Sequence, residues 1–196
     1  MAWLDGIEFT LLKGVYPPSE DTFMLIDALK GAPLSGKALE LCCGSGAVSL
    51  SVARRIDSIV AVDINPLAVA NTRINYERNG LSERLDAVAG DLFSPLGHVV
   101  FDLILMNPPY IPDDALANDP CWSGGTRGRE IIDRFLDKVG GFLSPPGSAF
   151  FIQSDINGEE ESLDRIRSGG MEGRVVRSAS FRFERIMVIQ LRRGQE

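Results

Sequence analysis

The segment ELCCGSG, residues 40–46, joins a predicted strand to a predicted helix. It ends the apolar run of residues 37–42, which predicts a β-strand, and it opens residues 46–56, which predict a helix. Small residues at such a turn let a ligand approach the backbone, and the helix start offers N–H groups without partners. An ordinary tight turn has the same composition, so the segment alone predicts a strand–turn–helix unit and not a function.

Strands and helices alternate on both sides of this segment. Further predicted strands occupy residues 58–63, 85–90, 101–106 and 148–153, and further predicted helices occupy residues 19–30, 66–79, 127–139 and 158–168. Strands separated by helices indicate crossover connections and a mostly parallel sheet with helices on both faces. The last two runs, 174–181 and 185–192, are too close for a helix between them and predict an antiparallel hairpin. We expect a doubly wound, mostly parallel, seven-stranded α/β sheet that ends in this hairpin.

Length and composition predict one domain. The chain has 196 residues, of which 44% are hydrophobic and 24% charged, as is usual for a globular protein with a sizeable core. We expect one domain over residues 1–196, with residues 1–18 as an N-terminal arm. No apolar run is long enough to cross a membrane, and the N-terminus lacks the pattern of a secretory signal, so we expect a cytoplasmic protein.

The charge distribution disfavours nucleic acid as a direct partner. The formal net charge is −7, whereas a protein that binds nucleic acid unaided usually presents a basic face. Six arginines follow residue 173, but solvated positions on edge strands are the simpler interpretation.

The cysteine and histidine content disfavours a metal site and nucleophilic catalysis. The three cysteines, Cys42, Cys43 and Cys121, form no CxxC pair, and His98 is the only histidine, in a loop-like stretch that predicts a surface position. We therefore expect no metal and a reduced, intracellular protein.

Carboxylates follow three successive predicted strands. Glu40 opens the glycine segment, which lacks the third glycine of a dinucleotide fingerprint because Ser49 stands there. A pyrophosphate would be repelled by Glu40, whereas a ligand with an ammonium and a sulfonium would be attracted. Asp63 can accept from ribose hydroxyls and Asp91 from an adenine amino group, while Leu92 offers an apolar wall. Each Asp could be a turn residue, but together the three carboxylates predict a site for a cationic, adenosine-containing ligand.

The segment NPPY, residues 107–110, follows a strongly apolar predicted strand. Its two prolines stiffen the backbone and remove two donors. The Asn107 side-chain oxygen and the Pro108 carbonyl can each accept one hydrogen of a planar NH₂ group, and the Tyr110 ring can pack on its flat face. Two acceptors on a weakly nucleophilic amide nitrogen favour charge developing there and orient it. A rigid turn after a strand is the alternative interpretation.

The residues that carry these features resemble a known family. The chain is similar to class I S-adenosylmethionine-dependent methyltransferases and, within them, to HemK-type protein glutamine N5-methyltransferases of the short eukaryotic and archaeal branch. The similar segments are VYPPSEDTFMLIDAL (15–29), LELCCGSGAVSL (39–50), AVDINPLAVANTRIN (61–75), GDLF (90–93), NPPYIP (107–112) and WSGGTRGREIIDRFL (122–136). The resemblance implies a Rossmann-like fold and methylation of the glutamine in the GGQ motif of a class 1 release factor.

The resemblance also implies roles for single residues. The implied contacts with S-adenosylmethionine are Thr22, Glu40, Cys42, Gly44, Gly46, Asp63, Asp91, Leu92 and Asn107. Asn107 would hold the substrate amide with Pro108 and Tyr110, and residues 122–129 would lie near the substrate cleft. The family usually has glycine where Cys42 stands, so a side chain there would restrict the turn or crowd the cofactor. Members of this branch often work with a small zinc-binding activator subunit.

Three functions remain open from the sequence. The first is methylation of a glutamine in a release factor. The second keeps the chemistry but uses amino groups of DNA or RNA bases, or another protein or a small molecule, as acceptor. The third is a scaffold that binds the cofactor without catalysis, which an intact NPPY segment disfavours.

Overall fold

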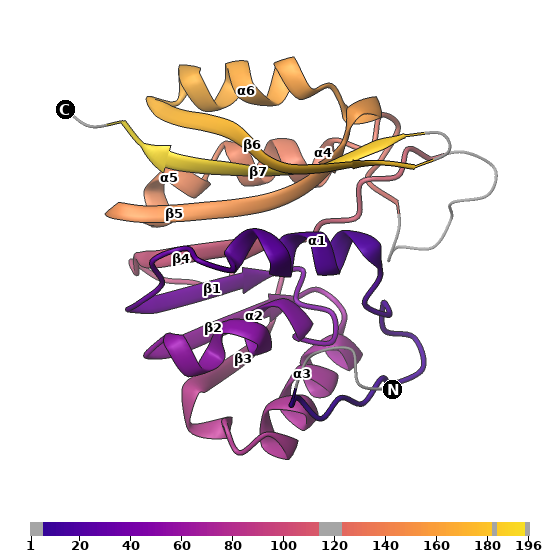
Figure 1. Ribbon diagram of the computed structural model, residues 1–196, viewed down its shortest axis with the longest axis vertical. Helices are drawn as coiled ribbons and strands as arrows, with labels where there is room; N and C mark the ends of the chain where they lie inside the picture. The colour runs from indigo at the N-terminus through magenta and orange to yellow at the C-terminus, as the bar shows by residue number, and fades with distance from the viewer. Residues whose placement is uncertain (1–5, 114–122, 182–183, 195–196) are drawn as a thin grey trace.

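A computed structural model describes residues 6–113, 123–181 and 184–194 of the chain. Its centre is a seven-stranded sheet in the order β3-β2-β1-β4-β5-β7-β6 (Figure 1). The strands are β1 (Lys37–Leu41), β2 (Ser58–Asp63), β3 (Leu85–Ala89), β4 (Phe101–Met106), β5 (Leu143–Ser154), β6 (Met171–Ser180) and β7 (Arg185–Arg193). The first five strands are parallel, and β7 pairs antiparallel with both β5 and β6. The predicted fold class is confirmed.

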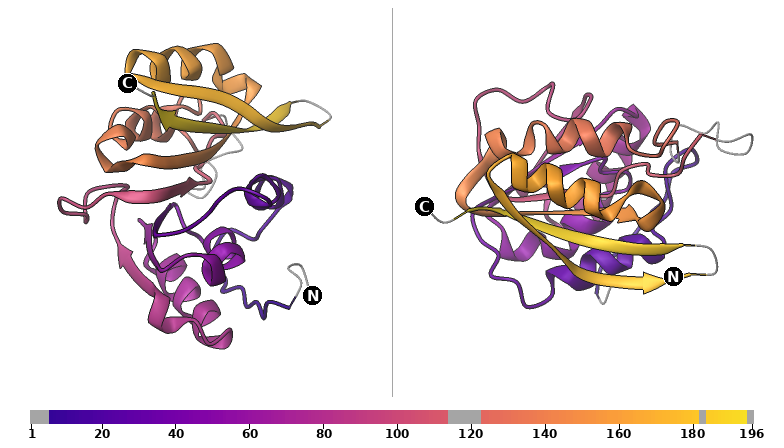
Figure 2. Two further views of the ribbon diagram at one scale, coloured as in Figure 1. Left: turned by 60° about the vertical axis from the view of Figure 1, so that its left-hand side comes forward. Right: turned by 90° about the horizontal axis from the view of Figure 1, so that it is seen from above.

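Helices cover both faces of the sheet (Figure 2). The helices are α1 (Glu20–Leu29), α2 (Ala47–Val52), α3 (Pro66–Arg78), α4 (Glu130–Leu136), α5 (Val139–Phe142) and α6 (Glu159–Ser168). The helices α1, α2 and α3 lie on one face, and α4, α5 and α6 lie on the other. The parallel strands are nearly continuous apolar runs because both faces are buried, and Leu39, Ile104 and Phe151 are fully enclosed.

Strand β1 lies between β2 and β4, so the chain reverses its direction of travel across the sheet at this point. Ligands in open α/β sheets bind outside the carboxyl ends of the strands at such a reversal. The segment after β1 and the NPPY segment after β4 therefore meet at one edge of the sheet.

Four predicted elements differ from the structure by more than one residue at an end. The predicted helix 46–56 is an α-helix only over Ala47–Val52 and continues as a 3₁₀ turn over Ala53–Arg55, and the predicted strand 174–181 begins at Met171. Strand β5 begins at Leu143 rather than at residue 148, because Leu143 pairs with Phe101 and the register then shifts so that Ser148 pairs with Leu103. The prolines of the intervening residues 144–147 cannot donate to a ladder. The predicted helix 127–139 begins only at Glu130, since Gly128 has a φ of 67° that no helix accepts, and it ends at Leu136.

The segment before α1 runs along helix α3. The N–H groups of Glu8, Thr10 and Leu12 donate to the side-chain oxygens of Asn79, Asn75 and Asn71, at 3.0, 2.7 and 2.7 Å. Two residues of extended chain and four residues of helix both advance about 6 Å, so the same hydrogen bond can form at three successive asparagines of the helix side. No helix in the described ranges is long and apolar enough to cross a bilayer.

Candidate active site

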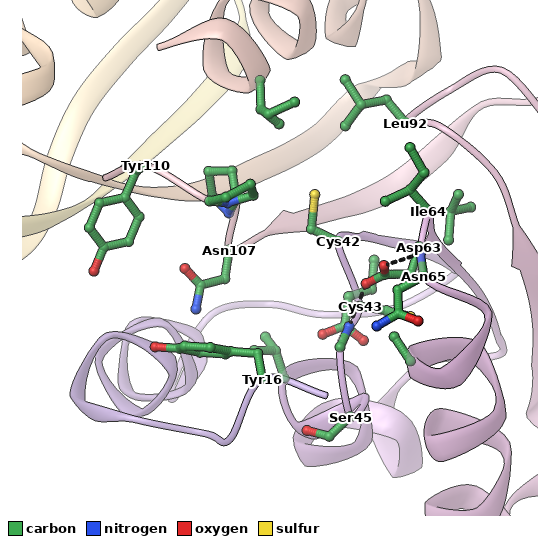
Figure 3. Close-up of a pocket in the computed structure, with 18 of the residues that line it drawn as sticks. Tyr16, Cys42, Cys43, Ser45, Asp63, Ile64, Asn65, Leu92, Asn107 and Tyr110 are labelled. Atoms are coloured by element: carbon green, nitrogen blue, oxygen red, sulfur yellow. Dashed lines mark hydrogen bonds between the residues drawn. The ribbon is translucent and has the colours of Figure 1, made fainter. Parts of the chain in front are cut away.

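A cavity of about 900 Å³ opens at the carboxyl ends of β1, β2, β3 and β4. This volume is typical of a site for a small ligand. Ten of the eleven predicted site residues line it: Thr22, Glu40, Cys42, Gly44, Asp63, Asp91, Leu92, Asn107, Pro108 and Tyr110. Figure 3 shows Asn107 and Tyr110 on one side, Asp63, Ile64 and Asn65 on the other, and Cys42 between them. The segments that the sequence singled out therefore share one cavity.

Gly46 is the predicted cofactor contact that does not line the cavity. Its φ is 74°, and a Cβ at this position would lie 2.7 Å from the Thr72 side chain on α3. The close approach of the loop to α3, rather than to a ligand, explains this glycine.

Cys42 has a φ of 53°, in the left-handed region that favours glycine. This backbone explains why the family usually has glycine here, and a side chain at the site stores strain in the turn. Burial, together with the negative charge of Asp63, raises the pKa of the Cys42 thiol above its usual range. Cys42 therefore stays a neutral thiol in the wall of the cavity and is no nucleophile at neutral pH.

Glu40 is the deepest carboxylate of the cavity, with 3% of its surface exposed. Burial raises its pKa to about 8, against hydrogen bonds from Ser49 that lower it. Its Oε2 atom is buried and has no hydrogen-bond partner among the described residues. A buried acceptor without a partner is costly, so this oxygen is ready for a donor that a ligand brings.

Asp63 fixes the glycine segment from the end of β2. Its Oδ2 accepts from the Gly44 N–H at 2.9 Å and its Oδ1 accepts from the Asn65 N–H at 2.8 Å (Figure 3). Each carboxylate oxygen has a second lone pair, so Asp63 can accept two further hydrogen bonds from a ligand. Burial raises the pKa of this carboxyl group.

Asp91, after β3, forms an ion pair with Arg134 of α4 at 2.5 Å. Arg134 also lines the cavity but was not among the predicted site residues, because nothing in its own segment indicates a site. Next to Asp91, Leu92 has a φ of 48°. Across the cavity wall, Ile64 keeps 72% of its surface exposed. Ile64 and Leu92 thus offer apolar surface to a ligand ring between the two carboxylates.

Asn107 lies directly after β4. Its Nδ2 donates to Thr22 Oγ1 on α1 at 3.4 Å, while its Oδ1 is buried and has no hydrogen-bond partner in the described part of the chain. The prediction that this oxygen is an acceptor for a substrate NH₂ group requires such a free lone pair.

The Tyr110 side chain is 9% exposed, and its hydroxyl donates to Asp21 Oδ2 at 3.3 Å. The Tyr16 hydroxyl approaches both oxygens of Asp21 at 3.1 Å. Burial, followed by the charge of Asp21, raises the pKa of both tyrosines above the usual range, so both keep their protons. From the sequence, Tyr16 had no predicted role, and Asp21 was not predicted to bind the hydroxyl of a tyrosine.

Asn157, between β5 and α6, holds the backbone of the NPPY segment in place. Its fully buried amide nitrogen donates to the carbonyl oxygens of Tyr110 at 2.7 Å and Gly128 at 3.2 Å. The buried Arg129 donates to the carbonyl oxygen of Asn157 and, at 3.0 Å, to that of Gly158. A rigid polar cluster thus joins the two loops that flank Asn107.

The segment between Asp113 and Ser123 lies outside the described residues; it includes Cys121 and Trp122, the first residue of the segment 122–129 that was expected near the substrate cleft. Its described ends meet, because the Gly124 N–H donates to Ile111 O at 2.8 Å and the Asp113 N–H donates to Gly125 O at 2.9 Å. Cys42 and Cys43 are free thiols, and His98 is exposed, as predicted. Within residues 6–113, 123–181 and 184–194, no three His, Cys, Asp or Glu side chains could hold a metal ion.

Comparison with known proteins points to one kind of enzyme. The family described as methyltransferase small domain matches residues 7–169. A putative protein N5-glutamine methyltransferase of Methanocaldococcus jannaschii is 33% identical over 193 residues, which cover 95% of this chain and 95% of that protein. The methyltransferase HEMK2 of Homo sapiens is 33% identical over 191 residues, which cover 90% of this chain and 88% of HEMK2.

A solved structure resembles this fold over most of its length. It is the E. cuniculi Mtq2–Trm112 complex, described as responsible for methylation of the eRF1 translation termination factor. The TM-score is 0.75 at 27% identity, and the match covers 92% of this chain and 99% of that one.

Proposed function

This chain belongs to the methyltransferase small domain family, and we propose that it transfers a methyl group from S-adenosylmethionine to the side-chain amide nitrogen of a glutamine in a translation release factor. The glutamine amide is the acceptor named for the relative from M. jannaschii, and a termination factor is the substrate named for the E. cuniculi complex. The resemblance of the motifs points further to the glutamine of a GGQ sequence.

The cavity residues fit S-adenosylmethionine, which supplies an electrophilic methyl group when it is bound. The unpartnered Oε2 of Glu40 can accept from the ligand's ammonium group, whose charge would also favour the ionised form of Glu40. Asp63 can accept from the ribose hydroxyls with its remaining lone pairs. Ile64 and Leu92 offer apolar surface to the adenine ring, with Asp91 at its edge.

Asn107 would bind the acceptor amide. Its Oδ1 accepts one hydrogen of the substrate NH₂ group, and the Pro108 carbonyl accepts the other. Both acceptors become more favourable as positive charge develops on the nitrogen, so they stabilise the transition state more than the ground state. They also hold the nitrogen in a fixed direction, which lowers the entropic part of the barrier.

One observation carries this proposal: Asn107 lines the same cavity as Glu40, Asp63 and Asp91, and its Oδ1 is buried without a hydrogen-bond partner among the described residues. An oxygen that only stiffened a turn would be hydrogen-bonded within the fold. The cavity therefore combines an acceptor for an NH₂ group with acceptors for a cationic nucleoside.

The Asn107→Ala variant tests the assigned role. We expect turnover to fall by about 100-fold or more, because an electrostatic contact to the transition state is lost. Calorimetry should show that S-adenosylmethionine still binds with little change in affinity, since the carboxylates remain. The matched control is Asn79→Ala, the same chemical change at the far end of α3, which should keep full turnover. Retained turnover in Asn107→Ala would contradict the role.

Nucleic acid remains the less favoured acceptor. The net charge is −7, and arginines of the C-terminal hairpin are engaged within the fold. Arg174 donates to the Gln190 side chain, Arg185 pairs with Glu159, and Arg192 donates to Ser148. Side chains used in this way are less available to neutralise phosphates.

We infer that a small partner subunit assembles with this chain, as Trm112 does with Mtq2. Large apolar side chains stay exposed in the N-terminal segment, at Leu11, and at the start of α3, at Leu67. Exposed apolar groups of this size support a covered surface. That such a subunit binds zinc stays a prediction.

A further inference from the structure

The hydroxyl group of Thr22 uses every hydrogen-bonding position that it has. Thr22 Oγ1 accepts from the Ser19 N–H at 3.3 Å and from Asn107 Nδ2 at 3.4 Å, and it lies 3.1 Å from Asp21 Oδ1. A hydroxyl has one hydrogen to donate and two lone pairs. Three neighbours therefore leave it no further partner.

The neighbours of the Thr22 hydroxyl group determine which hydrogen bonds it accepts and which it donates. A backbone N–H can only donate, so Ser19 takes one lone pair of Thr22. A carboxylate can only accept, so the Thr22 hydrogen must point to Asp21. The remaining lone pair of Thr22 Oγ1 can only accept a hydrogen bond. The NH₂ end of the Asn107 amide must therefore face it.

We propose that Asp21 and Thr22 are positioning residues that determine which end of the Asn107 amide faces the cavity. The negative charge of Asp21 fixes the Thr22 hydroxyl as an acceptor toward Asn107, which leaves Oδ1 as the free end. Without this constraint the amide could rotate by half a turn and present hydrogens to the substrate NH₂ group, which would repel it. The inference rests on the proposed function, because only an NH₂ acceptor requires an oxygen there.

The surroundings of Asp21 support this role. Asp21 is 4% exposed, and it accepts from the Tyr16 and Tyr110 hydroxyls and from the Thr22 N–H at 2.5 Å. These donors stabilise a carboxylate that would otherwise be costly to bury. Helix α1 alone would not require a buried carboxylate, since an exposed Asp serves equally well in a first turn.

The variant Asp21→Asn tests the inference because an amide can donate to Thr22 as well as accept from it. We expect kcat to fall about 10- to 100-fold, as for loss of one preorganised contact, with little change in the affinity for S-adenosylmethionine. The matched control is Ser19→Ala, which weakens the cap of α1 but keeps the Ser19 N–H. It should leave kcat unchanged.

The same substitution, made in a protein that already carries a change at Asn107, distinguishes a positioning role of Asp21 from a general contribution to the stability of the fold. In Asn107→Asp both terminal atoms are oxygens, so their orientation no longer matters. Adding Asp21→Asn to this variant should cause no further loss of kcat, because orientation is the only thing that Asp21 sets. An equal loss in both backgrounds would overturn the inference.

Nuclear magnetic resonance gives a readout that does not depend on the acceptor or on turnover. The side-chain NH₂ signals of Asn107, identified by their absence in Asn107→Asp, should show Overhauser contacts to the Thr22 methyl group. These contacts should weaken in Asp21→Asn and persist in Ser19→Ala. Unchanged contacts in Asp21→Asn would overturn the inference, whereas failure to methylate glutamine with the contacts as expected would overturn only the proposed function.

Discussion

At the scale of single residues, the cavity holds polar atoms that the fold leaves without partners. Glu40 Oε2 and Asn107 Oδ1 are both buried and unpaired within the described residues. Cys42 and Leu92 add two left-handed backbone conformations at the ends of strands. Buried unpaired acceptors and strained backbone both reduce stability, and both concentrate at functional sites. This combination identifies the site independently of any comparison.

The raised pKa of Glu40 predicts how stability depends on pH. The folded protein holds this proton up to a pKa of about 8, against 4.5 for an ordinary glutamate. Folding therefore takes up a proton between these values, and the stability of the cofactor-free protein should fall as the pH rises through this window. Glu40→Gln has no proton to lose. The difference between its unfolding free energy and that of the wild type should therefore shift in favour of the variant as the pH rises from 4.5 to about 8.

Urea unfolding at several pH values measures this difference. The control is Glu77→Gln, which removes an exposed carboxylate from α3 and should show no such change relative to the wild type. A constant difference between Glu40→Gln and the wild type across the window would contradict the assignment.

Some site residues could be predicted from the sequence, and others could not. Glu40, Asp63 and Asp91 each end or follow a strand, and the carboxyl ends of parallel strands meet at one edge, so their convergence follows from the pattern. Asp21, Tyr16 and Arg134 come from segments whose position depends on how the helices pack. Nothing local distinguishes Arg134 from an exposed arginine on a helix.

At the scale of elements, two loops are locked together beside the NPPY segment. A Cβ at Gly128 would lie 2.2 Å from the Tyr110 carbonyl oxygen and 2.5 Å from Asn157 Nδ2. The glycine lets the segment before α4 pass directly against the segment after β4. Asn157 donates to both backbones, so the position of Asn107 depends on the turn between β5 and α6 as well as on β4.

The variant Gly128→Ala should therefore impair both stability and turnover. We expect a loss of about 2 kcal/mol or more in unfolding free energy, from the clash and from a φ of 67° that alanine disfavours. Chemical denaturation together with a kinetic assay measures both effects. Gly97→Ala, where a Cβ meets nothing within 4 Å, is the control and should leave both unchanged. A fully stable and active Gly128→Ala variant would show that the close approach is not needed.

The same loops explain where the sequence analysis placed elements incorrectly. The apolar spacing of residues 127–139 indicates a helix, but the tight contact at Gly128 delays its start to Glu130. The strand from Leu143 is interrupted by prolines, so apolar spacing alone indicates only its second part. In both cases the deciding contact joins residues far apart in the sequence.

At the scale of the whole molecule, the topology brings the carboxylates that would bind the cofactor close to the segment that would bind the substrate amide. The reversal between β1 and β4 places the carboxylates of β1, β2 and β3 on one side and the NPPY segment on the other. A cationic nucleoside bound between Glu40, Asp63 and Asp91 would present its reactive group toward Asn107. The mostly parallel sheet and its terminal antiparallel hairpin were expected from the alternation of strands and helices. The order of the strands was not predicted, and the course of the N-terminal segment along α3 had no signal in its own residues.

The most direct test of this account is mass spectrometry of a release factor incubated with this protein and S-adenosylmethionine carrying a labelled methyl group, with and without a small partner subunit. We expect one labelled methyl group on the side-chain nitrogen of the GGQ glutamine, and almost none when Asn107→Ala replaces the wild type. Label on another residue or on nucleic acid, with the glutamine unmodified, would contradict it.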